Sequence, residues 1–257
     1  MIDLWLRSGA VGIVLGPFVL LALVATGIVW LTHLSPARPF FVSCIGVTGP
    51  FFAAVSLLFG LFAAFLANDV HNQNAEIRAA IFREADGLRT VLRLAEALGA
   101  AGKPVTAAAV AYTEAVLSKE WPAMRQWTSG PEDLGALRNL TLTVLQPEPG
   151  AVLPPAAHEV MLQSLVDIRQ ARLERLTLTA GVSDHMNWLA MFVLGVLTQI
   201  AVAVVHLDRL RPQALALAVF TTAFAATVVL IGLAEQPFSG RELDSAPFRA
   251  ALASATP

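Results

Sequence analysis

Long apolar runs alternate with segments of ordinary polarity along this chain of 257 residues. Asp, Glu, Lys and Arg are missing from four windows, residues 8–37, 39–68, 185–207 and 212–234. A helix needs about 20 apolar residues to cross a hydrocarbon core about 30 Å thick. The pattern therefore predicts an all-α protein with four membrane-spanning helices, at residues 11–34, 41–67, 187–205 and 214–234.

The middle of the chain, residues 68–186, has the periodicity of soluble helices and no strand signal. Apolar side chains recur every three or four residues at Ile77, Ile81, Leu88 and Leu92, which is the spacing of one helix face. Breaks rich in Gly and Pro divide this region into predicted helices at residues 69–99, 104–127, 131–146 and 155–185. The first and last of these helices should continue the second and third spans without a break.

The chain is therefore expected to have four parts: residues 1–67 and 187–234 in the membrane, 68–186 as a helical domain, and 235–257 as a C-terminal segment. Lys and Arg gather on the cytoplasmic side of membrane proteins. Arginines flank the spans on the side of the termini at Arg7, Arg78, Arg83, Arg169, Arg172, Arg175, Arg241 and Arg249. The other side has Arg38, Arg209 and Arg211. We expect a protein of the cytoplasmic (inner) membrane with its termini and helical domain in the cytoplasm.

Composition and motifs narrow the possible functions. The chain is 56% hydrophobic and 14% charged, with a formal net charge of −2, which excludes a single soluble globule and gives no reason to expect nucleic acid as a partner. Cys44 is the single cysteine, and the five histidines lack the spacing of a zinc site. The sequence also lacks the motifs of phosphate-binding and nucleophilic enzymes. We therefore expect neither a transition-metal site nor an enzyme.

The second span is amphipathic in side-chain size. On a helical wheel its small residues share one face, and Phe51, Val55, Leu58, Phe62 and Phe65 share the other. The small face could be a packing seam between helices, with the aromatic rings toward lipid, or it could line a narrow pore among several copies of the chain. The predicted pore-lining residues are Gly46, Thr48, Gly49, Ala53, Ser56, Gly60, Ala64 and Asp69.

Pro50 and two acidic residues favour the pore interpretation. Inside a helix, Pro50 would leave the carbonyl of Gly46 without its partner, and this oxygen, with the Thr48 hydroxyl, could replace part of a cation's hydration shell. A proline kink satisfied by a neighbouring helix is the alternative. Asp69 and Glu76 follow the span, and in a symmetric oligomer each would repeat as an acidic ring that concentrates cations. The alternative is a solvated start of the cytoplasmic helix.

Several short motifs occur in a characteristic order. They are Arg83-Glu84-Ala85, Glu120-Trp121-Pro122, the series Arg169, Arg172 and Arg175, Pro237-Phe238-x-Gly240, and Pro247-Phe248. From the second span to Phe248, their order and spacing resemble the bestrophin-like domain family of bacterial and plant membrane proteins. The resemblance implies four spans, a cytoplasmic helical insert and a homo-oligomeric ion channel, with cytosolic calcium as a candidate gating ligand.

The chain also departs from the true bestrophins, which conduct anions and bind calcium through a run of consecutive acidic residues. The longest such run here is Glu132-Asp133, so we do not transfer their anion selectivity. Calcium binds six to eight oxygens, and the predicted donors are Glu84, Asp86, Glu114, Glu120, Asp167 and Glu174. Alternatively, these acids form salt bridges with arginines of the same helices, for example Glu84 with Arg169 or Arg172.

Three functions therefore remain open. The first is a homo-oligomeric cation channel, with potassium as the favoured ion, whose partners are further copies of the chain, the bilayer and the permeating monovalent ion. The second is a membrane-anchored helical sensor or scaffold. The third is an anion channel of the bestrophin type.

Overall fold

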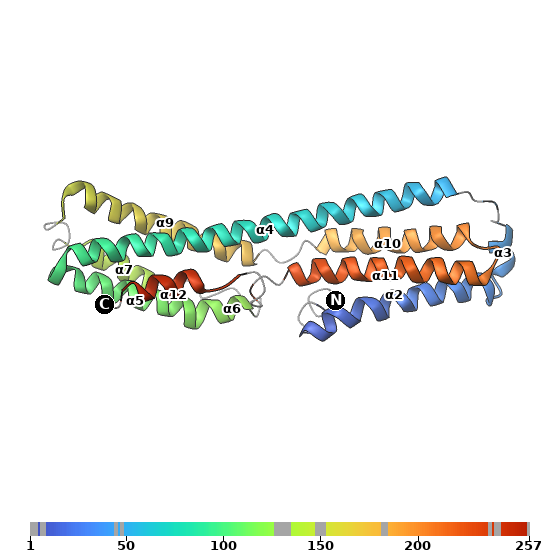
Figure 1. Ribbon diagram of the computed structural model, residues 1–257, viewed down its shortest axis with the longest axis horizontal. Helices are drawn as coiled ribbons and strands as arrows, with labels where there is room; N and C mark the ends of the chain where they lie inside the picture. The colour runs from blue at the N-terminus through green and yellow to red at the C-terminus, as the bar shows by residue number, and fades with distance from the viewer. Residues whose placement is uncertain are drawn as a thin grey trace. The chain divides into compact units, whose positions relative to one another are not determined.

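The computed structural model describes residues 5, 9–43, 46, 49–125, 135–146, 153–180, 185–235, 238 and 243–255. Thr48, one of the predicted pore-lining residues, lies outside this set. Within it, every regular element is helical, as predicted (Figure 1). The chain divides into a membrane unit, Met1–Asn72 with Ser183–Gln236, and a helical unit, Gln73–Val182 with Pro237–Pro257. The predicted limits at residues 67, 186 and 234 concern the membrane boundary and stay predictions.

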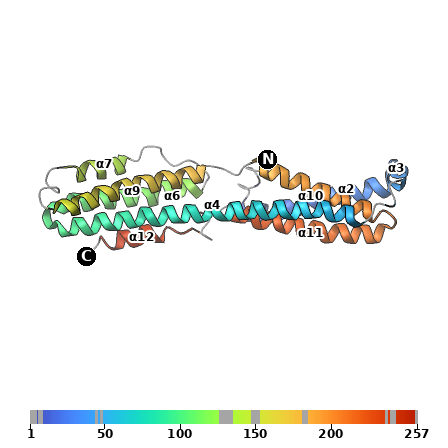
Figure 2. The same ribbon diagram turned by 90° about the horizontal axis from the view of Figure 1, so that it is seen from above.

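The membrane unit contains the four long apolar helices that the charge-free windows predict. Its elements are α2 (Gly9–His33), the short α3 (Arg38–Ser43), the first part of α4 (Gly49–Ala97), α10 (His185–Val205) and α11 (Leu210–Ala234). By length and composition, α2, α4, α10 and α11 can each cross a membrane. In both Figure 1 and Figure 2, α2, α10 and α11 run alongside one another. The prediction of four helices that are long and apolar enough to span a membrane is confirmed.

Aromatic rings fill the core of the membrane unit. The ring of Phe59 on α4 packs edge-on against those of Phe220 and Phe224 on α11, with centroids 5.6 and 4.9 Å apart. Large apolar side chains such as Leu57 and Leu215 instead face outward, with exposed fractions of 71% and 68%. An apolar exterior around an apolar core is expected where the surrounding solvent is lipid.

Several polar side chains inside the membrane unit form hydrogen bonds between helices. The Nε2 group of Gln199 on α10 donates to Thr221 Oγ1 on α11 at 2.9 Å. At the end of α11, Trp188 Nε1 donates to Glu235 Oε1 at 2.8 Å, and both side chains are buried. Because an unsatisfied polar group in hydrocarbon costs several kcal/mol, these bonds fix the register of α10 against α11.

The start of the second span differs from the prediction. The expected helix from residue 41 is replaced by α3, a turn at Gly46 with φ +117°, and α4, which begins at Gly49. Pro50 is thus the second residue of α4, where a missing N–H removes no helical hydrogen bond. The prediction that Pro50 frees a carbonyl of Gly46 inside a helix is therefore wrong. Gly46 has the left-handed conformation that glycine adopts most easily.

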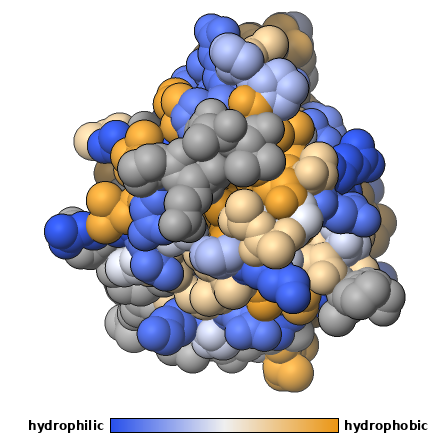
Figure 3. All heavy atoms as spheres, turned by 90° about the vertical axis from the view of Figure 1, so that its left-hand side faces the viewer, coloured by the Kyte–Doolittle hydropathy of each residue, from blue (hydrophilic) through white to orange (hydrophobic). Residues whose placement is uncertain are grey.

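The helical unit is built from the second part of α4 and shorter helices around it. These are a 3₁₀ turn η1 (Gly99–Gly102), α5 (Lys103–Ala115), a π-helical segment η2 (Val116–Glu120), α6 (Trp121–Arg125), α7 (Gly135–Val144), α9 (Pro155–Ala180) and α12 (Ala246–Ala253). The residues predicted to form the apolar stripe of α4, Ile77, Ile81, Leu88 and Leu92, are all in its core. Hydrophilic and hydrophobic residues mix at the end of this unit that Figure 3 shows.

The α4 helix is continuous from Gly49 to Ala97, so the predicted continuity of the second span with the first cytoplasmic helix is confirmed. The other predicted continuation is not described in full. Helix α9 ends at Ala180 and α10 begins at His185, and residues 181–184 lie outside the described part.

Candidate functional site

Four charged side chains form a buried network in the core of the helical unit. Arg175 donates through Nε to Glu84 Oε2 at 2.8 Å and through Nη2 to Glu84 Oε1 at 3.0 Å and Glu120 Oε2 at 2.7 Å. Arg172 donates through Nε to Glu120 Oε1 at 2.7 Å. The Tyr112 hydroxyl donates to Glu84 Oε1 at 2.6 Å. Two arginines thus balance two glutamates, as a buried charged cluster requires.

Helical spacing places these residues in the core. Glu84 lies on α4 between the buried Ile81 and Leu88, so it continues the apolar stripe. Arg172 and Arg175 lie on α9 one and two turns after the buried Ile168. Glu120 ends the π-helical segment η2. An extra residue in such a segment rotates the side chains that follow it, and Glu120 is here completely buried beside both arginines.

The C-terminal part of the chain packs over this network. The ring of Phe248 on α12 lies 5.7 Å from the guanidinium carbon of Arg175. The indole of Trp121 packs edge-on against Phe248 and Phe238, with centroids 6.1 and 5.4 Å apart. Arg125 Nε donates to the carbonyl of Phe238 at 3.1 Å. These aromatic side chains exclude water, which strengthens the ion pairs.

Burial and charge together set the protonation states. Burial alone would lower the pKa of Arg175, but the carboxylates of Glu84 and Glu120 outweigh it and raise this pKa above its ordinary value. Arg175 therefore stays charged. Burial raises the pKa of Tyr112 well above its ordinary value, and the neighbouring Glu84 carboxylate raises it further. Tyr112 therefore stays a neutral donor to Glu84.

The single tyrosine of the chain makes this shift measurable. In the unfolded chain Tyr112 should ionise near pH 10, whereas in the folded protein it should keep its proton at higher pH. The stability that the raised pKa provides is complete below about pH 10 and is lost as the pH rises toward the folded value. In an alkaline titration of the protein in detergent, we expect the tyrosinate absorbance to appear only as the helical unit unfolds.

A Tyr112→Phe variant is the control, because it should show no tyrosinate band. A tyrosinate signal near pH 10 with the helical content unchanged would contradict the buried bond to Glu84.

The structure does not gather the six predicted calcium donors into one site. Glu84 and Glu120 belong to the buried network. Glu174 Oε2 pairs with Arg83 Nη2 at 2.6 Å, and Glu114 is exposed on α5. Within the described ranges, no group of three His, Cys, Asp or Glu side chains is placed to hold a metal ion.

Salt bridges do form, as the alternative interpretation proposed. The suggested partners of Glu84 were Arg169 or Arg172, but Glu84 pairs with Arg175, and Arg172 pairs with Glu120.

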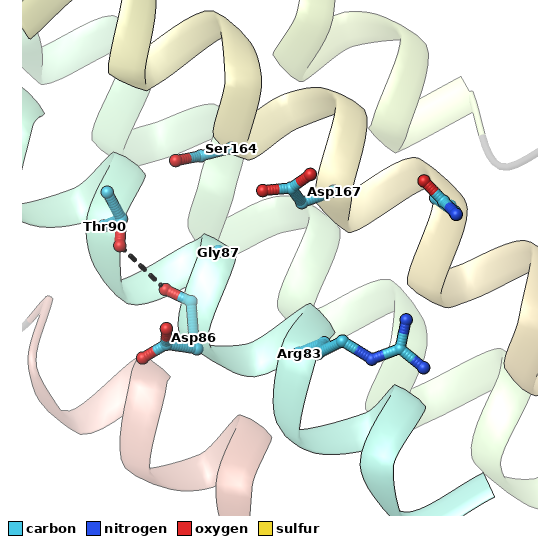
Figure 4. Close-up of a pocket in the computed structure, with 7 residues that line it drawn as sticks. Arg83, Asp86, Gly87, Thr90, Ser164 and Asp167 are labelled. Atoms are coloured by element: carbon cyan, nitrogen blue, oxygen red, sulfur yellow. Dashed lines mark hydrogen bonds between the residues drawn. The ribbon is translucent and has the colours of Figure 1, made fainter. Parts of the chain in front are cut away.

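The other two predicted donors, Asp86 and Asp167, line one open pocket between α4 and α9 (Figure 4). Its volume is about 210 Å³, and its other lining residues are Arg83, Gly87, Thr90, Ser164 and Gln170. At Gly87 the two helices approach closely, since a Cβ there would lie 2.7 Å from Ile168 Cγ1. The pocket therefore borders a tight helix contact and brings two carboxylates near hydroxyl and amide oxygens.

The small face of α4 is turned away from its own subunit. Gly49, Ala53, Gly60 and Ala64 are exposed, and Ser56 is half-buried. Gly46 before the helix and Asp69 after its apolar part are exposed as well. The neighbouring face packs into the core through Phe59, Ala63, Leu66 and Val70. Thus seven of the eight predicted pore-lining residues are described, and six of these seven are exposed in a single copy of the chain. Exposure leaves this face available to lipid, to another copy or to a pore.

The sequence did not predict the ion network as a site, although most of the network's residues lie in the short motifs described above. Glu84, Glu120, Arg172, Arg175, Trp121, Phe238 and Phe248 all come from those motifs and converge here. One signal was available, because Glu84 and Arg175 occupy positions on the apolar faces of their helices. The pairing itself depends on the packing of α4, η2 and α9.

The fold and the four apolar helices define an all-helical membrane protein. The model of the Bestrophin-like domain matches residues 19–241, and the chain therefore belongs to the Bestrophin-like family. No curated protein gives a significant match.

Solved structures share the fold over almost the whole chain. One described as a membrane protein has a TM-score of 0.72 at 12% identity and covers 94% of this chain and 97% of its own. A bacterial bestrophin homologue from Klebsiella pneumoniae has a TM-score of 0.70 at 13% identity and covers 94% and 96%. At this identity the similarity concerns the fold.

Proposed function

We propose that the protein is a homo-oligomeric ion channel of the cytoplasmic membrane, with the first part of α4 nearest the axis. The observation that carries this proposal is the exposed small face of α4 in a chain of the Bestrophin-like family. Small side chains let several helices approach an axis closely. We also propose that both termini and the helical unit lie in the cytoplasm, because more arginines flank the spans on that side.

The proposed selectivity is for cations, with potassium favoured. Its support is Asp69, which is exposed on α4 just after the apolar part. The Gly46 carbonyl does not support cation selectivity, because Pro50 starts α4 and does not interrupt it. A ring of carboxylates raises the local concentration of cations and lowers that of anions.

Neutralising this ring should weaken cation conduction. We expect Asp69→Asn to lower potassium conductance at low ionic strength by at least about twofold, and to move the reversal potential in a KCl gradient toward that of chloride. Single-channel recording of purified protein in planar bilayers measures both quantities. The matched control is Glu96→Gln, which removes an exposed acid elsewhere on α4. Unchanged conductance and reversal potential in Asp69→Asn would remove Asp69 from the mechanism.

We further propose that cytosolic calcium gates the channel by binding at the pocket of Asp86 and Asp167. Its support is that two carboxylates, two hydroxyls and one amide line the same pocket, which is the oxygen chemistry calcium prefers. Arg83 also lines the pocket, and its charge is paired with Glu174. In a liposome flux assay, calcium should increase potassium flux through the unaltered protein and have no effect on Asp167→Asn. An equal calcium response in both proteins would exclude this pocket, and no response in either would exclude calcium gating.

A further inference from the structure

Three arginines lie at one end of the membrane unit, the end where α2 finishes and α11 begins. Arg38 opens α3, and Arg209 and Arg211 border the start of α11. Figures 1 and 2 both place α3 at this end. The buried Thr32 Oγ1 on α2 lies 3.3 Å from Gln213 Oε1 on α11, so these two helix ends are adjacent. The three arginines therefore belong to one surface.

This surface carries an excess of positive charge. All three arginines are exposed, and none forms an ion pair with a residue in the described ranges. Two segments of the sequence lie at this end, residues 34–47 and 206–211. Their one acidic residue is Asp208, which is also exposed. Among the described residues of this surface, three positive charges therefore face one negative charge. On the proposed orientation, these arginines lie on the outer side of the membrane, against the usual preference of Lys and Arg for the cytoplasmic side. Such a placement favours a specific role for them.

Apolar side chains accompany the arginines. Helix α3 has no buried residue, and the exposed fractions of Phe40 and Val42 are 68% and 48%. The rings of Phe40 and Phe41 pack edge-on, 5.5 Å apart. Because α3 directly follows a membrane-spanning helix, these side chains lie at the level of the bilayer surface. Apolar groups there enter the boundary between headgroups and acyl chains, while nearby arginines reach the phosphates.

We propose that α3 and the start of α11 form a binding surface for anionic lipid headgroups such as phosphatidylglycerol. Arg38, Arg209 and Arg211 pair with the lipid phosphate, and Phe40 and Val42 insert beside its acyl chains. A free phosphate in solution would contact the arginines alone, whereas a lipid also has acyl chains that can contact the exposed apolar side chains of α3. The inference rests on the membrane location of α2 and α11 and is independent of which ion the protein conducts.

The test measures lipid selectivity of the full-length protein reconstituted in phosphatidylcholine vesicles. Electron paramagnetic resonance of spin-labelled lipids gives the association constant of phosphatidylglycerol relative to phosphatidylcholine. We expect the unaltered protein to prefer phosphatidylglycerol by at least about twofold at low salt, with a smaller preference at high salt. The triple variant Arg38→Gln, Arg209→Gln, Arg211→Gln should bring the ratio close to one.

Two matched variants test whether a lost lipid preference comes from this surface, from the net charge of the protein or from misfolding. The triple Arg→Lys variant at the same positions keeps the charge and should keep the preference. The triple variant Arg93→Gln, Arg138→Gln, Arg169→Gln removes the same charge from exposed positions of the helical unit and should also keep it. The proposal is overturned if the first triple variant retains the full preference, or if this control loses as much. Loss of the preference on adding inorganic phosphate would identify a free-anion site instead.

Discussion

Replacing Arg175 by Met should produce a large loss of stability in the helical unit. Arg175 is completely buried and donates to both Glu84 and Glu120. Its removal leaves two buried carboxylates that share only Arg172 and Tyr112 as charged or polar partners in the network. Breaking a buried ion pair from one side costs about 3–5 kcal/mol, which corresponds to a midpoint of thermal unfolding about 10 °C lower.

Circular dichroism of the purified protein in detergent measures this midpoint. The control is Arg169→Met on the same helix, where the side chain is exposed and the expected change lies within about 0.5 kcal/mol. Arg175→Lys should fall between the two, because a lysine keeps the charge but cannot donate two parallel bonds to Glu84. Equal midpoints for Arg175→Met and the unaltered protein would show that the network contributes nothing to stability.

Adding one methyl group at Gly195 should be the most damaging conservative change in the membrane unit. A Cβ on Gly195 of α10 would lie 2.0 and 2.1 Å from two ring carbons of Phe224 on α11. The ring cannot turn aside, because Phe224 is fully buried among Phe59, Phe192 and Phe220. Overpacking of this kind costs typically 1–3 kcal/mol, and we expect Gly195→Ala to lower stability by about 3 kcal/mol.

A second change in the same contact tests the cause. In the Gly195→Ala background, Phe224→Leu should restore part of the lost stability, although Phe224→Leu alone should be destabilising. Gly60→Ala is the control, since nothing lies within 4 Å of a Cβ at that position. Equal thermal midpoints for the unaltered protein and Gly195→Ala would show that α10 and α11 are not packed as closely as described. Additive effects of the two changes would show that the clash with Phe224 is not the cause.

The sequence predicts the membrane helices well because one physical requirement dominates them. A charge inside the bilayer is costly, so the four charge-free windows mark α2, α4, α10 and α11 with small errors at their ends. The largest error concerns Pro50, which the sequence pattern alone could not distinguish from a proline inside the span. The turn at Gly46 makes Pro50 a helix-starting residue.

The ion network could be predicted only in part. Glu84 and Arg175 lie on apolar helix faces, which signals burial, but their pairing depends on how α4 and α9 pack. Glu120 adds a second difficulty, since it is the last residue of a π-helical segment that the usual helical periodicity does not anticipate. The pore-lining residues remain predictions, as does calcium binding at Asp86 and Asp167, because they concern an assembly and a ligand beyond the single chain.

The most direct test of the proposed channel is chemical modification of α4 during conduction. In a Cys44→Ser background, Ala64→Cys introduces a thiol on the exposed small face, and Ala63→Cys introduces one at the neighbouring position, which is 7% exposed in its own subunit. We predict that a charged, thiol-reactive methanethiosulfonate reagent changes the potassium current of Ala64→Cys and leaves that of Ala63→Cys unaltered. A current that is insensitive at position 64, or no ion current from the reconstituted protein at all, would contradict a pore lined by α4.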